Sequence, residues 1–388
     1  MRFAKRMERL GTETAFEVLA RAKALEAQGK KIIHLEIGEP DFDTPLFIRE
    51  AAREALKNGR THYTPAGGIP ELRQAICEEV QRRRGVTVRP ENVVVTPGAK
   101  PIIYFPLTAL IEEGDEVIYP NPGFPIYESV IEFVGGKAVP LHLKEEKAFR
   151  FELSELQSLI TPRTRMIIIN SPQNPTGGIL TREDIRAIAA IARAHDLLVL
   201  SDEVYKNIIY EHEHASILAE PDMLERTILL DGFSKTYAMT GWRLGFGVMP
   251  APLAQKVEKL MINSNSCTAT FVQDAGVAAL RGSHDEADAF VREFKRRRDI
   301  MVDLLNQIKG VHCSKPGGAF YCFPNVSQTG ISSKQLADRL LNEAGVAVLS
   351  GTAFGKYGEG YLRLSYANSI ENIQEALRKM KQVIEALS

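Results

Sequence analysis

The feature that most constrains the fold is a regular alternation of short apolar segments and helical segments between Asn92 and Met249. Such alternation is typical of a mostly parallel sheet whose strands are connected by covering helices. We therefore predict one large α/β domain with a seven-stranded sheet, whose last, glycine-containing strand returns antiparallel. The expected strands are Val93–Thr96, Glu116–Tyr119, Ala138–Leu143, Met166–Asn170, Leu197–Ser201, Thr227–Leu230 and Leu244–Val248.

Beyond Met249 the alternation stops and helical patterns dominate. A long charged and apolar segment from His284 to Ile308 is followed by short strand candidates, and a further helix is expected near the N-terminus. We predict a smaller α+β domain built from the N-terminal segment and the C-terminal third. The expected division is 1–44, 45–283 and 284–388, and the other expected elements are a helix at Thr12–Gln28, an extended run at Ile32–Ile37, strands at Ala319–Phe323, Val346–Leu349 and Tyr361–Tyr366, and a helix at Ile370–Leu387.

Charge and cysteine content restrict the possible partners. A formal net charge of -1 over 388 residues provides no broad basic surface for nucleic acid or an anionic membrane, so any bound anion must be held locally. The four cysteines lack a CxxC spacing and are interpreted as reduced thiols. The basic segment from Met1 to Leu10 is not followed by an apolar stretch. We therefore predict a cytoplasmic protein with no nucleic-acid, membrane or metal ligand.

Lys235 is the first candidate for chemistry. It follows the apolar strand Thr227–Leu230 through a turn containing Gly232, and ligand crevices of open α/β sheets form where strands end. A lysine that is partly desolvated there has a lowered pKa and condenses with an aldehyde as a Schiff base.

Two loops rich in glycine and proline follow other strands. Gly98, Ala99 and Lys100 precede an apolar helix, where free backbone N–H groups favour a phosphate, although a plain strand-to-helix turn fits this motif equally well. The loop Asn170–Gly178 directs the Asn174 amide toward a ligand at a strand end, with a stiff connector as the alternative.

Asp202 and Tyr205 follow the strand Leu197–Ser201. An acid at a strand end needs a cationic partner, and a protonated pyridine nitrogen would serve. Tyr205, three residues later, is expected on the same side of a helical turn. The alternative without a catalytic role is that Asp202 caps a helix and Tyr205 belongs to the core. Phe124 adds an aromatic face after another strand.

Together with Lys235 and Arg243, these groups supply the contacts that pyridoxal 5'-phosphate requires: an amine, an acid, hydrogen-bond donors, cations and a helix end. At this point the chain closely resembles the class I/II aminotransferases, the fold-type-I pyridoxal-phosphate enzymes related to aspartate aminotransferase. The motifs that carry the resemblance are Ser171–Gly177, Asp202–Tyr205 and Ser234–Gly245, and it extends from Gly38–Phe42 to Leu362–Ser365.

The resemblance implies a set of residue roles. Lys235 would form the Schiff base and shuttle a proton, Asp202 would pair with the ring nitrogen, and Phe124 would stack on the ring. Tyr205 and Asn174 would contact the ring hydroxyl. The phosphate would lie on Gly98, Ala99, Lys100 and Arg243, with Ser234 nearby, although Gly232 stands where many relatives have a phosphate-binding serine.

The resemblance also implies substrate contacts and a partner. Arg363 would bind the substrate α-carboxylate, with Asn174 and the Gly38 backbone beside it. Tyr63 would reach the phosphate of the neighbouring subunit, so a homodimer is expected. The implied reaction moves an amino group by ping-pong chemistry between an L-amino acid (aspartate, alanine or an aromatic one) and a 2-oxo acid, with glutamate/2-oxoglutarate as one pair.

Two other functions fit part of the pattern. A pyridoxal-phosphate carbon–sulfur β-lyase would use the same cofactor contacts. A regulatory ligand-binding domain, like those fused to winged-helix repressors, is disfavoured because the chain lacks a basic DNA-binding module.

Two further segments are interpreted without a catalytic role, and three others as parts of the pocket for the substrate side chain. His212-Glu213-His214 is expected on the surface rather than at a metal, and Lys295–Arg298 is expected to be the solvated face of a helix. The side-chain pocket is expected to involve Glu13–Phe16, the Gly38 loop and Asn263–Ser266, without a second arginine that would select dicarboxylates.

Overall fold

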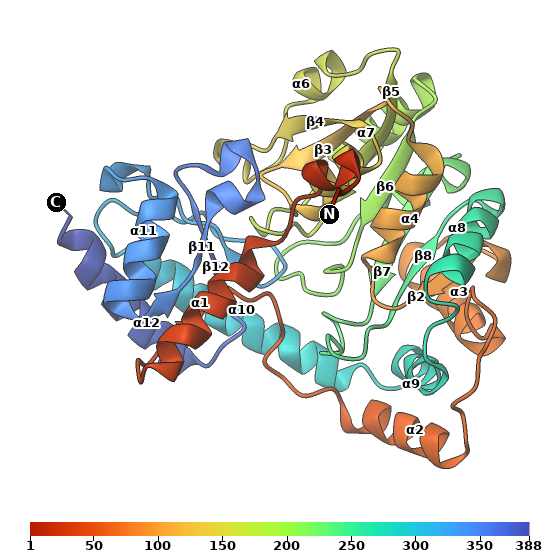
Figure 1. Cartoon of the computed structure of the whole chain (residues 1–388), viewed down its shortest axis with the longest axis horizontal. Helices are drawn as coiled ribbons and strands as arrows, with labels where there is room; N and C mark the ends of the chain where they lie inside the picture. Colours follow the sequence, from red (N-terminus) through yellow and green to blue (C-terminus); the bar gives the residue numbers. More distant parts are fainter. Residues whose placement is uncertain (388) are drawn as a thin grey trace.

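A seven-stranded sheet forms the centre of the computed structural model, which describes residues 1–387. The spatial order is β2-β8-β7-β6-β5-β3-β4 (Figure 1). The strands are β2 (Val93–Thr96), β3 (Glu116–Asn121), β4 (Lys137–His142), β5 (Thr164–Asn170), β6 (Leu198–Asp202), β7 (Thr227–Gly232) and β8 (Gly245–Val248). Each predicted strand is present, with ends shifted by up to two residues.

The strand directions bring distant segments to one edge of the sheet. β4, β3, β5, β6 and β7 pair in parallel, whereas β8 is antiparallel to both β7 and β2, as the sequence predicted. Gly245 at the start of β8 pairs with Gly232 at the end of β7 and with Thr96 at the end of β2. The segment entering β8 therefore lies beside the carboxyl ends of the parallel strands, where ligands of such sheets bind.

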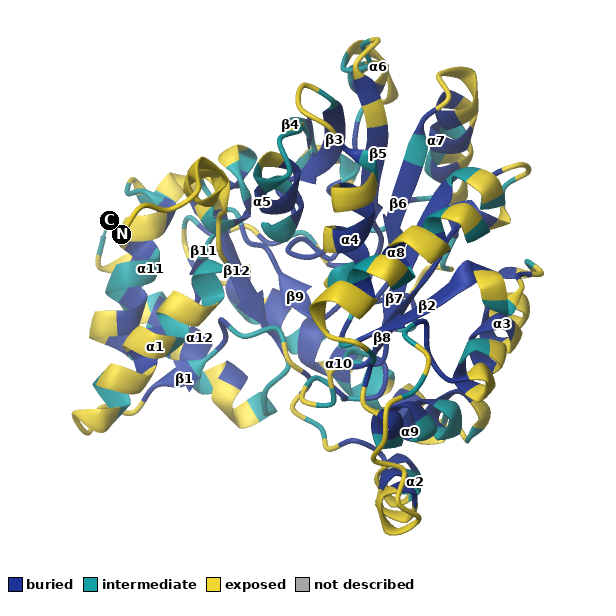
Figure 2. Ribbon diagram, turned by 45° about the vertical axis from the view of Figure 1, so that its right-hand side comes forward, coloured by how far each residue is buried: buried dark blue, intermediate teal, exposed yellow. Residues whose placement is uncertain are grey.

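Helices cover both faces of this sheet, so that its strands are mostly buried, with the exception of the edge strand β4 (Figure 2). On one face, α4 (Pro101–Leu110), α5 (Ile126–Phe133) and α8 (Ala251–Ser264) share an apolar cluster with Ile168. On the other, α7 (Arg182–Ala194) packs on Ile167 and Ile169, while α3 (Pro70–Arg84) and α9 (Thr270–Arg281) pack on Val95. Alternate strand residues thus serve opposite layers, which explains why the strands read as continuous apolar runs.

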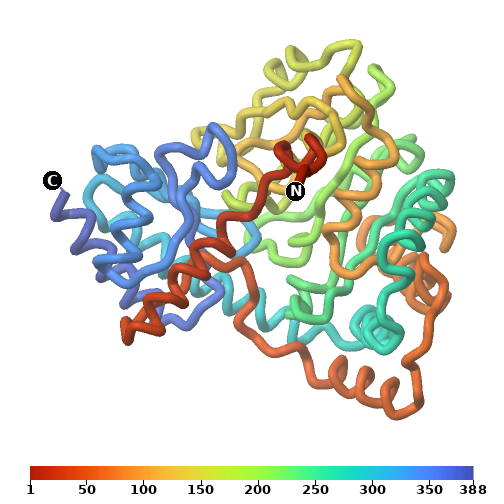
Figure 3. The backbone as a smooth tube through the Cα atoms, viewed as in Figure 1, coloured from red at the N-terminus to blue at the C-terminus, as the bar shows by residue number. Residues whose placement is uncertain are grey.

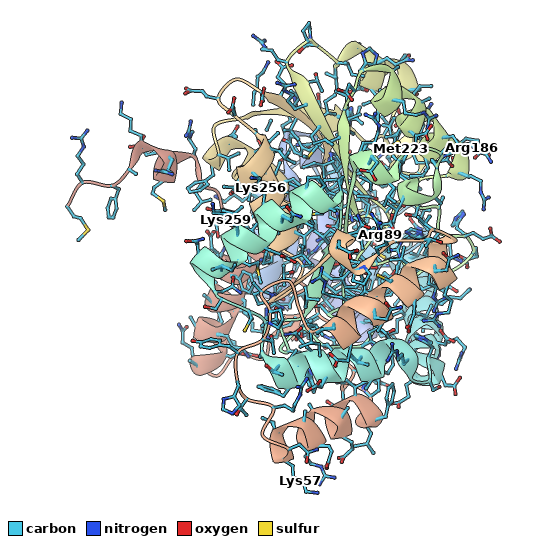
Figure 4. All side chains as sticks on the ribbon, turned by 90° about the vertical axis from the view of Figure 1, so that its right-hand side faces the viewer. Lys57, Arg89, Arg186, Met223, Lys256 and Lys259 are labelled. Carbon is cyan, nitrogen blue, oxygen red and sulfur yellow. The ribbon has the colours of Figure 1, made fainter. Side chains whose placement is uncertain are left out.

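Helix α8 keeps its lysines on the outside. In α8, Ala254, Val257 and Met261 are buried, whereas Lys256 and Lys259 point away from the body (Figure 4). Two more helices belong to this part of the molecule: α2 (Leu46–Lys57), which packs against α9, and the short α6 (Leu153–Ser158). No helix within residues 1–387 is long and apolar enough to cross a membrane.

The remaining elements form two small sheets and a group of helices. β11 (Leu349–Ser350), β12 (Leu362–Ser365) and β9 (Tyr321–Cys322) form an antiparallel sheet, and β1 (Ile33–His34) pairs in parallel with β10 (Val346–Ala347). The predicted strand Val346–Leu349 was therefore wrong as a single element, because its two halves pair with different partners. The helices here are α10 (Asp285–Leu305), α11 (Ser333–Arg339) and α12 (Ile370–Glu385).

The N-terminal segment runs across the molecule (Figure 3). Helix α1 (Thr14–Ala27) packs near β10 and β11, while the backbone N–H of Gly11 donates to Ser129 Oγ of α5 at 2.9 Å. The segment thus contacts both groups of elements, and the division into three domains stays a prediction.

Candidate active site

A cavity of about 540 Å³ opens where β5, β6 and β7 end. It is bounded by loops from the N-terminal segment, the seven-stranded sheet and the C-terminal strands. Of the residues predicted for the site, those in its wall are Gly38, Ala99, Lys100, Phe124, Asn174, Asp202, Tyr205, Ser234, Lys235, Arg243 and Arg363.

Lys235 reaches this cavity from the turn that follows β7. Its Nζ donates a hydrogen bond to the Gly38 carbonyl oxygen at 2.6 Å and lies 5.9 Å from the ring centroid of Tyr205. Burial lowers the pKa of the amine to about 8, and the nearby cation Arg363 acts in the same direction. A substantial fraction of the amine is therefore neutral near physiological pH, which makes it both a nucleophile and a base.

Asp202 is the last residue of β6 and is buried. Its Oδ2 accepts a hydrogen bond from the Tyr127 hydroxyl at 2.6 Å, and its Oδ1 accepts one from the Val204 N–H at 3.2 Å. Burial raises the pKa of the carboxyl to about 6, although these hydrogen bonds oppose the rise. The carboxylate forms no ion pair within residues 1–387, so a cationic ligand group would stabilise its charge.

Arg363 on β12 also lines the cavity and is buried. Its Nη1 donates to Asn174 Oδ1 at 3.3 Å, Nη2 donates to the Glu36 carbonyl oxygen, and Nε has no partner among residues 1–387. The guanidinium lies 4.6 Å from the ring centroid of Tyr321. Because no carboxylate in the described chain pairs with it, Arg363 is suited to an anionic ligand, and a planar carboxylate matches its geometry.

Arg243 and the start of α4 form a second cationic corner. Arg243 precedes β8, and its Nη1 donates to the Thr240 carbonyl oxygen at 2.7 Å. A Cβ atom at Gly98 would overlap the Arg243 guanidinium, and the φ of Gly98 is +83°. The missing side chain at position 98 therefore lets the cation lie against the backbone that leads into the N-terminus of α4, an arrangement that favours a phosphate.

Lack of space does not explain why position 232 is a glycine. A Cβ atom there would be 3.4 Å from Gly245 Cα and 3.6 Å from the Ala99 side chain, which is ordinary contact distance. A small side chain would fit, so the absence of the family serine removes a potential donor without a packing reason. Ser234 lines the cavity nearby.

Phe124 and Lys100 form the wall next to the N-terminal segment. Lys100 Nζ lies 5.8 Å from the Phe124 ring centroid and forms an ion pair with Glu13. The Phe124 ring packs edge-on against Tyr127 at 5.6 Å. Glu13 and Phe16 line the cavity, as expected for the side-chain pocket.

A buried network of ion pairs lies next to the carboxyl ends of β6 and β7. Arg84, the last residue of α3, contacts Glu203 at 2.7 Å and Asp231 at 3.0 Å, and Lys206 contacts Asp231 at 2.8 Å. The network ties the residue after Asp202 to the strand that leads to Lys235. Removing one partner would leave a buried charge uncompensated.

Some predicted residues lie outside the cavity wall. Gly98 lies behind Arg243, Tyr63 is 88% exposed, and residues 263–266 do not contribute to the lining.

The prediction that Lys295–Arg298 form a solvated helix face was wrong for two of these four residues. Arg297 and Arg298 are buried: Arg297 pairs with Asp41, and Arg298 pairs with Glu211 and Asp299, because this side of α10 packs on the rest of the chain.

Two tyrosines of the site were missed. Tyr127 follows Phe124 by three residues on α5, so helical spacing from a suspected stacking residue was an available signal. Tyr321 lies on β9, and its hydroxyl is 2.8 Å from the Tyr205 hydroxyl. Tyr321 belongs to a segment in which no motif was recognised. Only the pairing of β9 with β12 brings this residue beside Arg363.

Comparisons with known proteins identify the family of this chain. The profile of the family "Aminotransferase class I and II" matches residues 30–380. An aspartate aminotransferase of Pyrococcus abyssi is 44% identical over 92% of both chains. An aromatic-amino-acid aminotransferase of Thermococcus litoralis is 43% identical over 92% of this chain and 93% of its own.

A solved structure agrees in fold. The aspartate aminotransferase from Rhizobium meliloti superposes with a TM-score of 0.96 at 35% identity, with 100% of both chains covered. These comparisons give no support to a carbon–sulfur β-lyase. By its sequence, its fold and its relatives, the chain belongs to the class I and II aminotransferase family.

Proposed function

We propose that this aminotransferase binds pyridoxal 5'-phosphate in the cavity and transfers an amino group between an L-amino acid and a 2-oxo acid. When bound, this cofactor supplies an aldehyde that receives the amino group and a ring that accepts electrons from the substrate Cα. The residues proposed to hold it are Lys235 at the aldehyde, Asp202 at the ring nitrogen, Tyr205 and Asn174 at the ring hydroxyl, Phe124 on the ring face, and Gly98, Ala99, Lys100, Ser234 and Arg243 at the phosphate.

The observation that carries the proposal is the presence of two unpaired buried charges and a reactive amine in one cavity. Asp202 is a buried acid without a cation, Arg363 is a buried cation without a carboxylate, and Lys235 is an amine with a pKa of about 8. Each of the two buried charges costs stability unless a ligand group of opposite charge binds, and the amine is suited to condense with an aldehyde. A ligand that combines a basic ring nitrogen and an aldehyde, together with a substrate carboxylate, satisfies all three.

The residues of the chain then have distinct tasks. Arg363 binds the substrate α-carboxylate and thereby fixes the orientation of the substrate Cα. Lys235 would take the proton from this carbon in the half-reaction that removes the amino group, and would give a proton to the corresponding carbon of the 2-oxo acid in the half-reaction that adds it; an amine with a pKa near neutrality is suited to both tasks. The Gly38 carbonyl oxygen, which accepts the hydrogen bond from Lys235 Nζ at 2.6 Å, orients the amine. Asp202 holds a proton on the ring nitrogen.

The relatives suggest the substrates. Those named above are an aspartate and an aromatic-amino-acid aminotransferase. We therefore propose aspartate or an aromatic amino acid as donor, with alanine as a further candidate and glutamate/2-oxoglutarate as the other pair. The side chain of Lys100 forms an ion pair with Glu13, so the cavity wall next to the N-terminal segment carries both signs of charge and does not select one class of donor by charge alone.

We also propose that the active form is a homodimer acting in the cytoplasm. Tyr63 is exposed and lies away from the cavity of its own chain, as expected if it reaches the phosphate in a second subunit. The four cysteines are free thiols, as suits a reducing compartment. Sedimentation of the loaded protein at several concentrations tests the dimer.

Titration with the cofactor tests the proposed function. The wild-type chain should gain visible absorbance with one cofactor per chain, whereas Lys235→Ala should lose the covalent attachment and essentially all turnover. A panel of amino donors, each mixed singly with the loaded enzyme, should convert the bound cofactor to its aminated form and release the 2-oxo acid that matches each donor, with no thiol or sulfide released from a sulfur-containing donor. A colourless wild-type protein in excess cofactor would refute the proposal.

A further inference from the structure

Two tyrosine hydroxyls meet at the centre of the cavity wall. The hydroxyl of Tyr205, which follows β6, lies 2.8 Å from the hydroxyl of Tyr321 on β9. Both side chains are buried, and both line the cavity. Within residues 1–387 neither hydroxyl has another hydrogen-bond partner. The pair therefore has two protons and uses one of them, which leaves one proton for a ligand.

Tyr321 also touches the two other groups on which the reaction depends. A Cβ atom at Gly38 would overlap the Tyr321 hydroxyl, so this hydroxyl lies directly against the residue whose carbonyl oxygen holds Lys235. The ring of Tyr321 faces the Arg363 guanidinium at 4.6 Å. One side chain thus contacts the proposed ring-hydroxyl donor, the lysine acceptor residue and the carboxylate-binding arginine.

The proposed role of Tyr205 sets the direction of the shared hydrogen bond, in which either hydroxyl could be the donor. If Tyr205 donated to Tyr321, it would have no proton left for the ring oxygen that it is proposed to contact. If Tyr321 donates, the Tyr205 hydroxyl is satisfied as an acceptor, and its own proton is free for the cavity. Donation from one hydroxyl polarises the next and strengthens the hydrogen bond that it donates.

We propose that Tyr321 is a positioning residue, which donates its hydroxyl proton to Tyr205 and thereby directs the proton of Tyr205 toward an oxygen of the bound cofactor. The inference rests on the proposed function, because the acceptor belongs to the cofactor. Tyr321 acts through Tyr205 and does not itself need to touch the reacting atoms.

The test uses the loaded enzyme and the variant Tyr321→Phe, which removes the hydroxyl and keeps the ring over Arg363. The readout is the pH titration of the visible absorbance of the cofactor joined to Lys235. A hydrogen bond donated to the ring oxygen stabilises negative charge on this oxygen. When the hydrogen bond is weakened, the negative charge attracts the proton on the nitrogen that joins Lys235 to the cofactor more strongly. We expect the titration midpoint to rise by about 0.5 pH unit and the cofactor dissociation constant to rise about threefold, since the Tyr205 bond is weakened rather than lost.

Tyr366→Phe is the matched control. Tyr366 is fully buried, and its hydroxyl lies 3.1 Å from the hydroxyl of Tyr210, but neither residue lines the cavity. The control loses the same chemical group from the same kind of pair. It should leave the titration midpoint and the dissociation constant at wild-type values.

A double variant decides whether Tyr321 acts through Tyr205. Tyr205→Phe should shift the midpoint further than Tyr321→Phe, and adding Tyr321→Phe to it should cause no additional shift. An additional shift in the Tyr205→Phe background, or an unshifted Tyr321→Phe enzyme that still binds the cofactor, would overturn the inference. Failure of the wild-type chain to bind the cofactor would instead refute the proposed function.

Discussion

The hydrogen bond between Tyr127 and Asp202 gives a prediction with a definite size. Asp202 is a buried acid with a pKa of about 6, and the Tyr127 hydroxyl, at 2.6 Å from Oδ2, is the largest of the effects that lower this value. A hydrogen bond to a charged group contributes about 1.5–3 kcal/mol. Since one pKa unit corresponds to about 1.4 kcal/mol, the variant Tyr127→Phe should raise the pKa of Asp202 by roughly one to two units.

The sign follows from which form of the acid the hydrogen bond favours. Tyr127 donates to the carboxylate, so its loss disfavours the charged form and Asp202 keeps its proton to a higher pH. In the cofactor-free protein at pH 7, Asp202 should be mostly ionised in the wild type and about half or more protonated in the variant. A neutral acid no longer attracts a ring cation, so the affinity for pyridoxal phosphate should fall in parallel.

Infrared difference spectroscopy measures this directly. The carbonyl band of a protonated carboxyl is followed against pH in the cofactor-free protein, and Asp202→Asn identifies the band. Tyr119→Phe serves as the control, because Tyr119 is also a buried tyrosine whose hydroxyl contacts Asn121 instead. An Asp202 band that titrates at the same pH in Tyr127→Phe and in the wild type would refute the reasoning.

Three other outcomes follow from the structure. Lys235 should react with an amine-specific label with a midpoint near pH 8, because burial lowers its pKa; mass spectrometry of the labelled peptide measures this, and a midpoint above pH 10 would contradict it. Gly98→Ala should weaken cofactor binding at least tenfold in an equilibrium titration, because the methyl group would displace the Arg243 guanidinium, whereas Gly59→Ala, also at positive φ but in open space, should not. Arg298→Ala should lower the free energy of unfolding in urea by about 1.5–3 kcal/mol, because it removes a fully buried side chain and its charge-assisted hydrogen bonds, while the acids left behind are partly exposed; Arg296→Ala, whose side chain is 67% exposed, should change it by less than about 0.5 kcal/mol, and equal losses would count against the argument.

The sequence by itself determined the large sheet and most of the site. Apart from the edge strand β4, the strands from Val93 to Val248 are largely buried on both faces, so they read as apolar runs separated by helical patterns, and the pattern alone indicates a parallel sheet. Loops at the carboxyl ends of such strands must meet. For this reason Asn174, Asp202 and Lys235 could be placed in one site before any contact was known.

Only the tertiary structure decided which residues complete that site and which charges are buried. The short strands β9 to β12 are two to four residues long, too short to show a period, and their pairing depends on long-range contacts. Tyr321 reaches Tyr205 through that pairing. Burial of Arg298 likewise depends on the packing of α10 against a distant loop. Local patterns encode periodicity and turn chemistry, whereas the pairing of distant side chains depends on how the whole chain closes on itself.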